Sequence, residues 1–244
     1  MTFLRQLARI KSSYYEHNSR VCMQLPNLNS KLYFSLAIFL LCMAVFNFLS
    51  AIFMPFECYY FMDYNNYYTC NVQYRIMTIE DRVTVEKAIG EHLEGKTDDD
   101  VEKLTLSNAF KLQLFPHNVN NIFKNLKYIN MVYENLTLIT TEDLKVFPKL
   151  QTLDLSGNQI EFISKDTFIF NPNIEEIWLY DNKISHIDPT SFDKLKNLKV
   201  LVLDKNVCTF ERALNRTEVL KIIGKIVQGF CISDRFTTDW NRLT

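Results

Sequence analysis

The stretch Leu150-Gln151-Thr152-Leu153-Asp154-Leu155-Ser156-Gly157-Asn158 decides the fold of this 244-residue chain, because its pattern recurs every 24 residues. Two further copies open at Ile174 and Leu198 and keep the asparagine in register. A fixed period of this size is typical of stacked units, each of which buries its apolar face against its neighbours. We therefore predict a solenoid in which consecutive copies lie side by side.

Each copy alternates apolar and polar residues over a short run, which is typical of a strand with one buried face. Leu153 and Leu155 are expected to point into the core, while the polar residues around them face outward. The asparagine suits the turn that follows, because its amide can both donate to and accept from backbone groups that turning leaves unpaired. The expected ladder consists of Asn158, Asn182 and Asn206.

Two upstream copies, opening at Val101 and Leu126, keep the apolar spacing but not the asparagine. Ala109 and Glu134 occupy that position instead, and terminal repeats are expected to be atypical. A large aromatic residue recurs on the return side of each unit, where we expect it to fill the core. These aromatic residues are Phe123, Phe147, Phe168 and Phe192.

These residues resemble the leucine-rich repeat superfamily, specifically its extracellular 24-residue class, over about 101–206. The resemblance implies an α/β-type solenoid of about five repeats, with a parallel sheet on the concave face and irregular segments on the convex side. It implies no particular ligand, because one architecture serves many partners.

The 25 residues 32–56 contain no charged side chain. As a helix they would extend roughly 37 Å, enough to cross a hydrocarbon core of about 30 Å. The preceding residues 1–31 carry five basic residues against one acidic residue, a bias that keeps the amino terminus in the cytosol. We predict an apolar membrane or signal helix over 32–56, with the rest of the chain outside the cytosol.

Two interpretations of this segment stay open. An uncleaved signal anchor would give a type II membrane protein, and the small-residue cleavage pattern is indeed poor because Phe48 or Leu49 stands three residues before the cut. A signal peptide removed near Ala51 would give a secreted protein, and a start at Met23 would give this leader a conventional length. The expected localisation is extracellular in either case.

Four cysteines follow the apolar segment and flank the repeats as two pairs. An open solenoid exposes its apolar interior at both ends, and oxidised pairs commonly hold small caps together. A zinc site is the weaker alternative, because no Cys-x-x-Cys or paired histidine accompanies them. The expected disulfides are Cys58 with Cys70 at the amino end, and Cys208 with Cys231 at the carboxyl end.

The expected organisation is therefore a basic leader, an apolar helix, an amino-terminal cap, the repeats and a carboxy-terminal cap. The alternating run Val72, Tyr74, Ile76 predicts strand in the first cap, whose region 90–104 resembles caps of secreted insect leucine-rich repeat proteins. Residues 217–228 predict a helix that covers the last repeat. The boundaries are 1–31, 32–56, 57–95, 96–206 and 207–244.

Two Asn-x-Thr sequons begin at Asn135 and Asn215 and would meet the glycosylation machinery in that compartment. No motif in the sequence indicates catalysis, a cofactor or a metal. The four histidines lack the spacing of metal ligands, and the acidic triplet 98–100 lacks the spacing of a calcium-binding loop. Removing the +4 of residues 1–31 from the net charge of −1 leaves −5, which argues against nucleic acid. We expect no enzyme.

The outward positions of the strands form three columns across the repeats. Neighbouring strands lie about 4.8 Å apart, so aromatic and apolar residues of the last repeats would meet as one patch with a charged rim. Such a patch is typical of a protein-binding hot spot, although the same residues could pack under the cap or simply cover a β-surface. The expected partner-binding residues are Trp178, Tyr180, Val200 and Val202, with Glu176 and Asp204 on the rim.

The sequence thus predicts an extracellular recognition protein, immune or cell-adhesive, whose partner is another protein. A structural scaffold that self-associates, or pairs with a second repeat protein, is the alternative. A membrane contact through 32–56 is expected if that segment is not cleaved.

Overall fold

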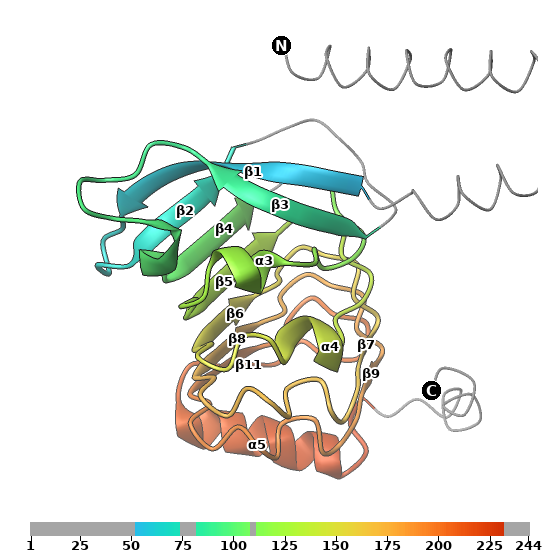
Figure 1. Cartoon of the computed structure of the whole chain (residues 1–244). Helices are drawn as coiled ribbons and strands as arrows, with labels where there is room; N and C mark the ends of the chain where they lie inside the picture. The colour runs from blue at the N-terminus through green and yellow to red at the C-terminus, as the bar shows by residue number, and fades with distance from the viewer. Residues whose placement is uncertain (1–51, 74–81, 108–110, 232–244) are drawn as a thin grey trace, which may run out of the picture. The chain divides into compact units, whose positions relative to one another are not determined.

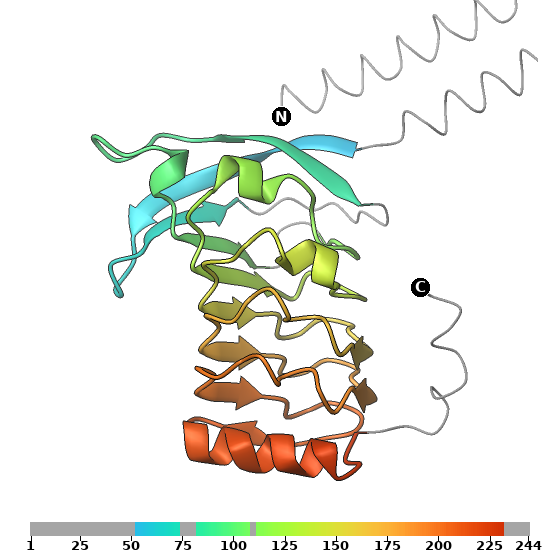
Figure 2. The ribbon, with the colours of Figure 1, turned by 60° about the horizontal axis from the view of Figure 1, so that its bottom comes forward.

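The computed structural model describes residues 52–73, 82–107 and 111–231. Within these ranges the chain builds a nine-stranded sheet in the order β11-β10-β8-β6-β5-β4-β2-β1-β3. Figures 1 and 2 show the strands stacked as a ladder from the amino-terminal cap down to helix α5. The five parallel repeat strands are β4 (Lys103–Ser107), β5 (Tyr128–Val132), β6 (Thr152–Asp154), β8 (Glu176–Trp178) and β10 (Val200–Val202).

The repeat strands pair in the register that the 24-residue period predicts. Leu153 lies opposite Ile129 on one side and Ile177 on the other, and the same row continues to Leu104 and Leu201. All five side chains are buried. The row confirms the predicted solenoid, because residues one period apart occupy equivalent positions on adjacent parallel strands.

The asparagine ladder satisfies backbone groups on neighbouring turns, as Asn182 illustrates. Its side-chain oxygen accepts from the amide of Ile160 at 3.1 Å, and its nitrogen donates to the carbonyl oxygens of Leu155 at 3.0 Å and Leu179 at 3.2 Å. Buried polar groups must be paired in this way if they are not to cost stability. Equivalent bonds are made by Asn158 and Asn206.

The residue before each ladder position has a left-handed backbone. The φ angles are 60° at Tyr133, 70° at Gly157, 56° at Asp181 and 57° at Lys205. Glycine adopts this region without strain, whereas in other residues it raises the conformational energy of the backbone. Gly157 is also required for space, because a Cβ there would lie 2.2 Å from the ring of Tyr133.

Glu134 occupies the ladder position of the weaker copy and is fully buried. One of its carboxylate oxygens accepts from the backbone amide of Lys111 at 3.0 Å, so it keeps the accepting half of the asparagine role. The equivalent first position, Ala109, lies outside the described residues.

The convex side returns each turn through short elements rather than long helices. The predicted phenylalanines are buried behind them, and the rings of Phe168 and Phe192 stack with centroids 5.8 Å apart. The buried amide of Asn171 donates to the carbonyl oxygens of Leu144 and Phe147, which ties adjacent turns on this side. The elements are α3 (Val119–Ile122), α4 (Thr141–Leu144), β7 (Phe162–Ile163) and β9 (His186–Ile187).

The amino-terminal cap is made of strands that join the same sheet. β1 (Ile52–Met62) pairs antiparallel with β2 (Tyr68–Val72) and parallel with β3 (Val83–Ile89), and β2 pairs parallel with β4. The cap thus continues the ladder of the repeats. The predicted strand residues Tyr74 and Ile76 lie outside the described residues.

The predicted apolar helix over 32–56 was wrong at its end, because residues 52–56 begin β1. Met54 and Phe56 of this strand are buried in the cap. Their apolar character therefore serves the protein core. In the part of the chain that the structure describes, no helix has the length and hydropathy needed to cross a membrane.

A polar network holds the loop that follows β3. The hydroxyl of Tyr60 donates to Asp98 at 2.5 Å, and the hydroxyl of Tyr68 lies 3.0 Å from Nδ1 of His92. Burial, with the nearby Asp98 carboxylate adding to it, raises the pKa of Tyr60 well above its usual range. The short 3₁₀ turn η1 (Asp98–Asp100) closes this loop.

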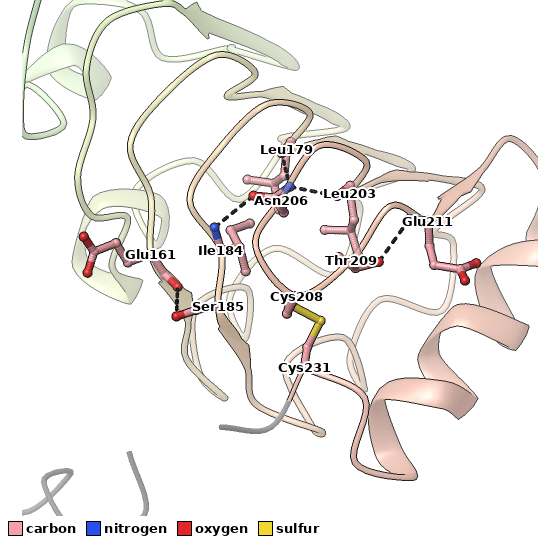
Figure 3. The surroundings of a disulfide bond; sticks show 10 residues. All are labelled: Glu161, Leu179, Ile184, Ser185, Leu203, Asn206, Cys208, Thr209, Glu211 and Cys231. Atoms are coloured by element: carbon pink, nitrogen blue, oxygen red, sulfur yellow. Dashed lines mark hydrogen bonds between the residues drawn. A yellow bond between two sulfur atoms is a disulfide. The ribbon is translucent and has the colours of Figure 1, made fainter. Parts of the chain in front are cut away.

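One disulfide lies in each cap, as predicted. Cys58 is bonded to Cys70 across the β1–β2 pair, and Cys208 is bonded to Cys231 at the other end. Figure 3 shows the second bond beside the last ladder residue, Asn206. The backbone amide of Cys208 donates to the carbonyl of Ile184 at 3.0 Å, so the disulfide is fixed against the preceding turn.

The carboxy-terminal cap closes the sheet with a two-residue strand and a helix. β11 (Arg212–Ala213) pairs antiparallel with β10, and α5 (Arg216–Val227) lies across the end of the ladder (Figures 1 and 2). Asn215 caps the helix by accepting from the amide of Glu218 at 3.1 Å. The buried residues of α5 are Val219, Ile222 and Ile226, as its predicted apolar spacing requires.

Candidate functional site

The concave face is the solvent side of strands β1, β2, β4, β5, β6, β8 and β10. Two of the predicted columns are in register across all five repeat strands: the first column is Lys103, Tyr128, Thr152, Glu176, Val200, and the second is Thr105, Asn130, Asp154, Trp178, Val202. The structure extends both onto the cap, because Thr69 pairs with Lys103 and Asn71 with Thr105. The second column reads Tyr59, Asn71, Thr105, Asn130, Asp154, Trp178, Val202.

The cap adds an aromatic end to this face, which the repeat pattern of the sequence did not predict. Tyr59 and Phe61 come from β1, pair with Asn71 and Thr69, and stack with ring centroids 5.6 Å apart. Tyr59 is 61% exposed. The face therefore carries aromatic side chains near both ends rather than at one.

The predicted aromatic pair near the carboxyl end is half-exposed. The indole nitrogen of Trp178 donates to the carboxylate of Glu176 at 3.1 Å, which fixes both side chains. The ammonium group of Lys205 lies 4.8 Å from the centroid of the Tyr180 ring. A hydrogen bond to Tyr180 raises the pKa of Lys205 above its usual range, so this cation stays charged beside the ring.

Val202 does not belong to an exposed patch, which corrects the sequence prediction. It is only 2% exposed, because β11 places Arg212 directly opposite it. Arg212 also forms an ion pair with Asp204, so that rim carboxylate is already neutralised. Val200 is half-buried and remains on the face with Trp178 and Glu176.

A second charged cluster lies toward the amino end of the face. Lys103 pairs with Asp63 at 2.9 Å, and its ammonium group lies 4.3 Å from the centroid of the Tyr128 ring. Burial alone would raise the pKa of Asp63, but hydrogen bonds from Lys103 and the Tyr67 amide outweigh it and hold that pKa below its usual range. This end of the face is therefore internally paired.

Asp154 stands between the two ends and has a different environment. Burial raises its pKa above the usual range, and hydrogen bonds from Ser156 oppose that shift only in part. Asp154 lies directly opposite Trp178 on the neighbouring strand. Among the described residues, no lysine, arginine or histidine forms an ion pair with Asp154 or Glu176.

Neither sequon lies on a strand of this face. Asn135 is half-buried at a turn edge, where it lines an open pocket of about 330 Å³ with Lys111, Gln159 and Lys183. Asn215 is exposed at the start of α5, and its side-chain oxygen is used as the helix cap. Its side-chain nitrogen, the atom that a glycan would modify, is not part of that bond.

The acidic triplet 98–100 uses its carboxylates within the protein. Asp98 accepts from Tyr60, Asp99 pairs with Lys124 at 3.0 Å, and Asp100 accepts from the backbone amide of Thr97 at 2.9 Å. The residues that the structure describes hold no group of three or more acidic, histidine or cysteine side chains suited to a metal ion.

Comparison with known proteins agrees with the repeat geometry. The family model described as "Leucine rich repeat" matches residues 148–207. The chain contains leucine-rich repeats. This match covers the three copies that keep both the strand pattern and the ladder asparagine, and the register of β4 and β5 extends the same arrangement toward the amino end.

Several relatives share this region. The chain is 29% identical to Toll-like receptor 9 of Mus musculus over 105 residues, which is 43% of this chain and 10% of the receptor. It is 29% identical to the oligodendrocyte-myelin glycoprotein of Homo sapiens over 103 residues, 42% of this chain and 23% of that protein. With a Rattus norvegicus protein, leucine-rich repeat-containing G-protein coupled receptor 5, it shares 34% over 107 residues, 44% of this chain and 12% of the receptor. The chain thus spans less than a quarter of the length of each.

Solved structures give matches of similar extent. The Toll–Spatzle complex of Drosophila aligns with a TM-score of 0.43 and 20% identity, over 52% of this chain and 18% of the matched chain. A complex of TLR13 with ssRNA13 aligns with a TM-score of 0.41 and 23% identity, over 57% of this chain and 21% of that one.

Proposed function

We propose that this leucine-rich repeat chain is a recognition protein that binds another protein through its concave face, without catalysis. The observation that carries the proposal is the row of half-exposed side chains on a rigid sheet, with Trp178 fixed by its bond to Glu176. A fixed aromatic side chain loses little conformational freedom on binding, which is why aromatic residues dominate protein-binding hot spots.

The partner-binding residues that we propose are Trp178, Tyr180 and Val200, with Glu176 and Asp204 at their rim. A Trp178→Ala, Tyr180→Ala double variant should fold normally, because neither side chain is buried in the core. It should lose capture of a protein partner in a surface-binding assay. Normal folding with undiminished capture would remove this patch from the proposal.

We propose that the chain acts outside the cytosol, in an immune or cell-surface setting. Two cap disulfides support this location, because such bonds persist in oxidising compartments. Residues 32–51 are the proposed signal or anchor, and the two sequons are proposed glycosylation sites. Peptide mapping before and after glycosidase treatment should show mass loss at Asn135 and Asn215.

β1 begins at Ile52, immediately after the proposed cleavage point near Ala51. A secreted chain cut there and an uncleaved type II anchor would both keep the described cap strand, so we propose the two forms as alternatives. Amino-terminal sequencing of protein recovered from medium and from membranes distinguishes the two. Recovery of an intact amino terminus only from membranes would establish the anchor instead.

A self-associating scaffold is the second candidate, and the carboxy-terminal cap gives a specific reason to test it. Phe210 is 78% exposed and Val207 is 69% exposed, and the same cap also exposes Leu220 and Val227 of α5. Equilibrium sedimentation should give the mass of one chain if the protein is a recognition module. A concentration-dependent dimer that Phe210→Ser abolishes would favour the scaffold.

A further inference from the structure

Three side chains of β6 and β8, toward the carboxyl end of the concave face, form one corner. Asp154 and Trp178 are directly paired across β6 and β8, and Glu176 accepts from the Trp178 indole at 3.1 Å. Residues directly opposite on adjacent strands have Cβ atoms about 5 Å apart, and diagonal neighbours lie about 7 to 8 Å apart. Two carboxylates and an indole ring are therefore within reach of one incoming group.

The rest of this face supplies its own cations. Lys103 neutralises Asp63, and Arg212 neutralises Asp204. Lysine ammonium groups also lie against the rings of Tyr128 and Tyr180. Two carboxylates and two aromatic rings of this face, those of Asp63, Asp204, Tyr128 and Tyr180, therefore each have a lysine or arginine neighbour within the protein.

The corner itself has no such neighbour within the described ranges. Neither Asp154 nor Glu176 forms an ion pair there, and no lysine or arginine lies over the ring of Trp178. The corner therefore offers acceptors and a π-face but few donors.

We propose that Asp154, Glu176 and Trp178 bind an arginine or lysine side chain presented by the protein partner. The inference rests on the proposed binding function of the concave face and specifies the chemistry of its partner. An arginine guanidinium has five donors and no acceptor, so it complements two carboxylates, and it stacks on an indole face. Charge-assisted bonds of this kind are about twice as strong as neutral ones.

The test uses the full chain carrying Trp240→Phe, which leaves Trp178 as the only tryptophan because the sequence has two. Titration with a hexa-arginine peptide should quench Trp178 fluorescence saturably, whereas hexa-glutamate should not. The Asp154→Asn, Glu176→Gln variant should bind hexa-arginine at least about tenfold more weakly, which corresponds to about 1.4 kcal/mol. Raising the salt concentration should weaken the wild-type binding and leave the variant nearly unchanged.

The matched control removes the same charge elsewhere. Glu142→Gln, Glu161→Gln alters two exposed glutamates outside the concave face and should change hexa-arginine affinity by less than about twofold. Equal weakening in both double variants would overturn the proposal, because it would reduce the effect to net charge. Absence of saturable quenching in the parent would overturn it as well.

The same two double variants distinguish a failure of the cationic contact from a failure of the proposed binding function. Where a protein partner has been captured, loss of its binding in the Trp178→Ala, Tyr180→Ala variant but not in Asp154→Asn, Glu176→Gln would keep the concave face and reject the cationic contact. Loss in both variants supports the proposal. Retention in both rejects the proposal together with the concave face.

Discussion

The two ends of the solenoid are capped in different ways. Both must cover an apolar interior and protect the outermost strand, and each contains one disulfide. The amino end adds strands β1, β2 and β3 to the sheet, so its backbone pairing is continuous with the repeats. The carboxyl end stops the sheet with two-residue β11 and covers the last turn with α5.

This difference decides what each cap contributes to function. Strands that join the sheet lengthen the concave face, which is how Tyr59 and Asn71 become part of a column that the repeats begin. A strand that ends the sheet shortens the face, which is how Arg212 comes to cover Val202. The two caps should also differ in how they unfold, because only the amino cap shares its hydrogen-bonded ladder with the repeats.

The largest expected effect concerns the cap cores. Phe56→Ala should lower the free energy of unfolding by about 4 kcal/mol, because Phe56 is fully buried in a strand of the main sheet. Ile226→Ala should cost about 3 kcal/mol. Hydrogen exchange should show protection lost across β1 to β4 in the first variant and mainly in α5 in the second. Exchange that spreads equally through the repeats in both would erase the contrast between the caps.

Breaking the disulfides should give the next largest effect. The Cys208→Ser, Cys231→Ser variant should lower the free energy of unfolding by about 3 kcal/mol. The Cys58→Ser, Cys70→Ser variant should lower it slightly less, because the Cys58–Cys70 bond spans 12 residues and the Cys208–Cys231 bond spans 23. Urea denaturation measures both. The amino cap should stay folded without its bond, since five β1–β2 residue pairs remain, whereas α5 should become sensitive to protease. Protease resistance of α5 in the Cys208→Ser, Cys231→Ser variant would show that packing alone keeps this helix folded.

Removing one ion pair at each end should lower the free energy of unfolding by less than removing a disulfide does. Asp63→Asn should cost about 2 kcal/mol at neutral pH, because Asp63 is buried and bonded to Lys103. Its folded-state pKa is lowered, so this stability is present above the unfolded value of about 3.9 and is lost as pH falls below it. Unfolding measured from pH 2 to 7 should show a shallower acid slope in the variant. Asp204→Asn, whose partner Arg212 is exposed, should cost less than about 1 kcal/mol.

The smallest effect should come from the start of α5. Asn215→Ala should cost about 1 kcal/mol by removing the helix cap that Glu218 uses. Thr217→Ala also destroys the sequon but leaves that cap in place, so it serves as the control. Thermal unfolding of unglycosylated protein should separate the variants, and equal stability would mean that the cap contributes nothing there.

The repeat strands, the buried phenylalanines and the asparagine ladder could be predicted because the 24-residue period repeats the same physical demand at each turn. Leu153 and its equivalents must all point into one core. Asn158 and Asn182 must each pair equivalent backbone groups one repeat apart, such as the carbonyl oxygens of Leu155 and Leu179. Two strand columns follow directly from that period. No similar repetition exists in the caps, so their geometry depends on contacts between segments distant in sequence.

The apolar run 32–56 shows where hydropathy is ambiguous. A buried strand and a membrane helix are equally apolar over a few residues, so the run gave no boundary at Ile52. The available signal was the spacing of Met54, Phe56, Cys58 and Tyr60 at every second position, and the structure buries all four. β11 offered no signal of comparable strength, because two residues are too few for a pattern. The Lys103–Asp63 pair joins residues far apart in sequence and could not be derived from spacing.

The antiparallel strand β11 limits how this architecture can grow. A further unit placed after β10 would meet a reversed strand and the flank of α5 instead of a parallel neighbour. Duplication of an internal segment such as 150–173 would meet matching edges above and below, because β6 pairs with β5 and β8 in one register. Elongation of the molecule by evolution or by protein engineering should therefore proceed by insertion between existing turns, leaving both closures intact.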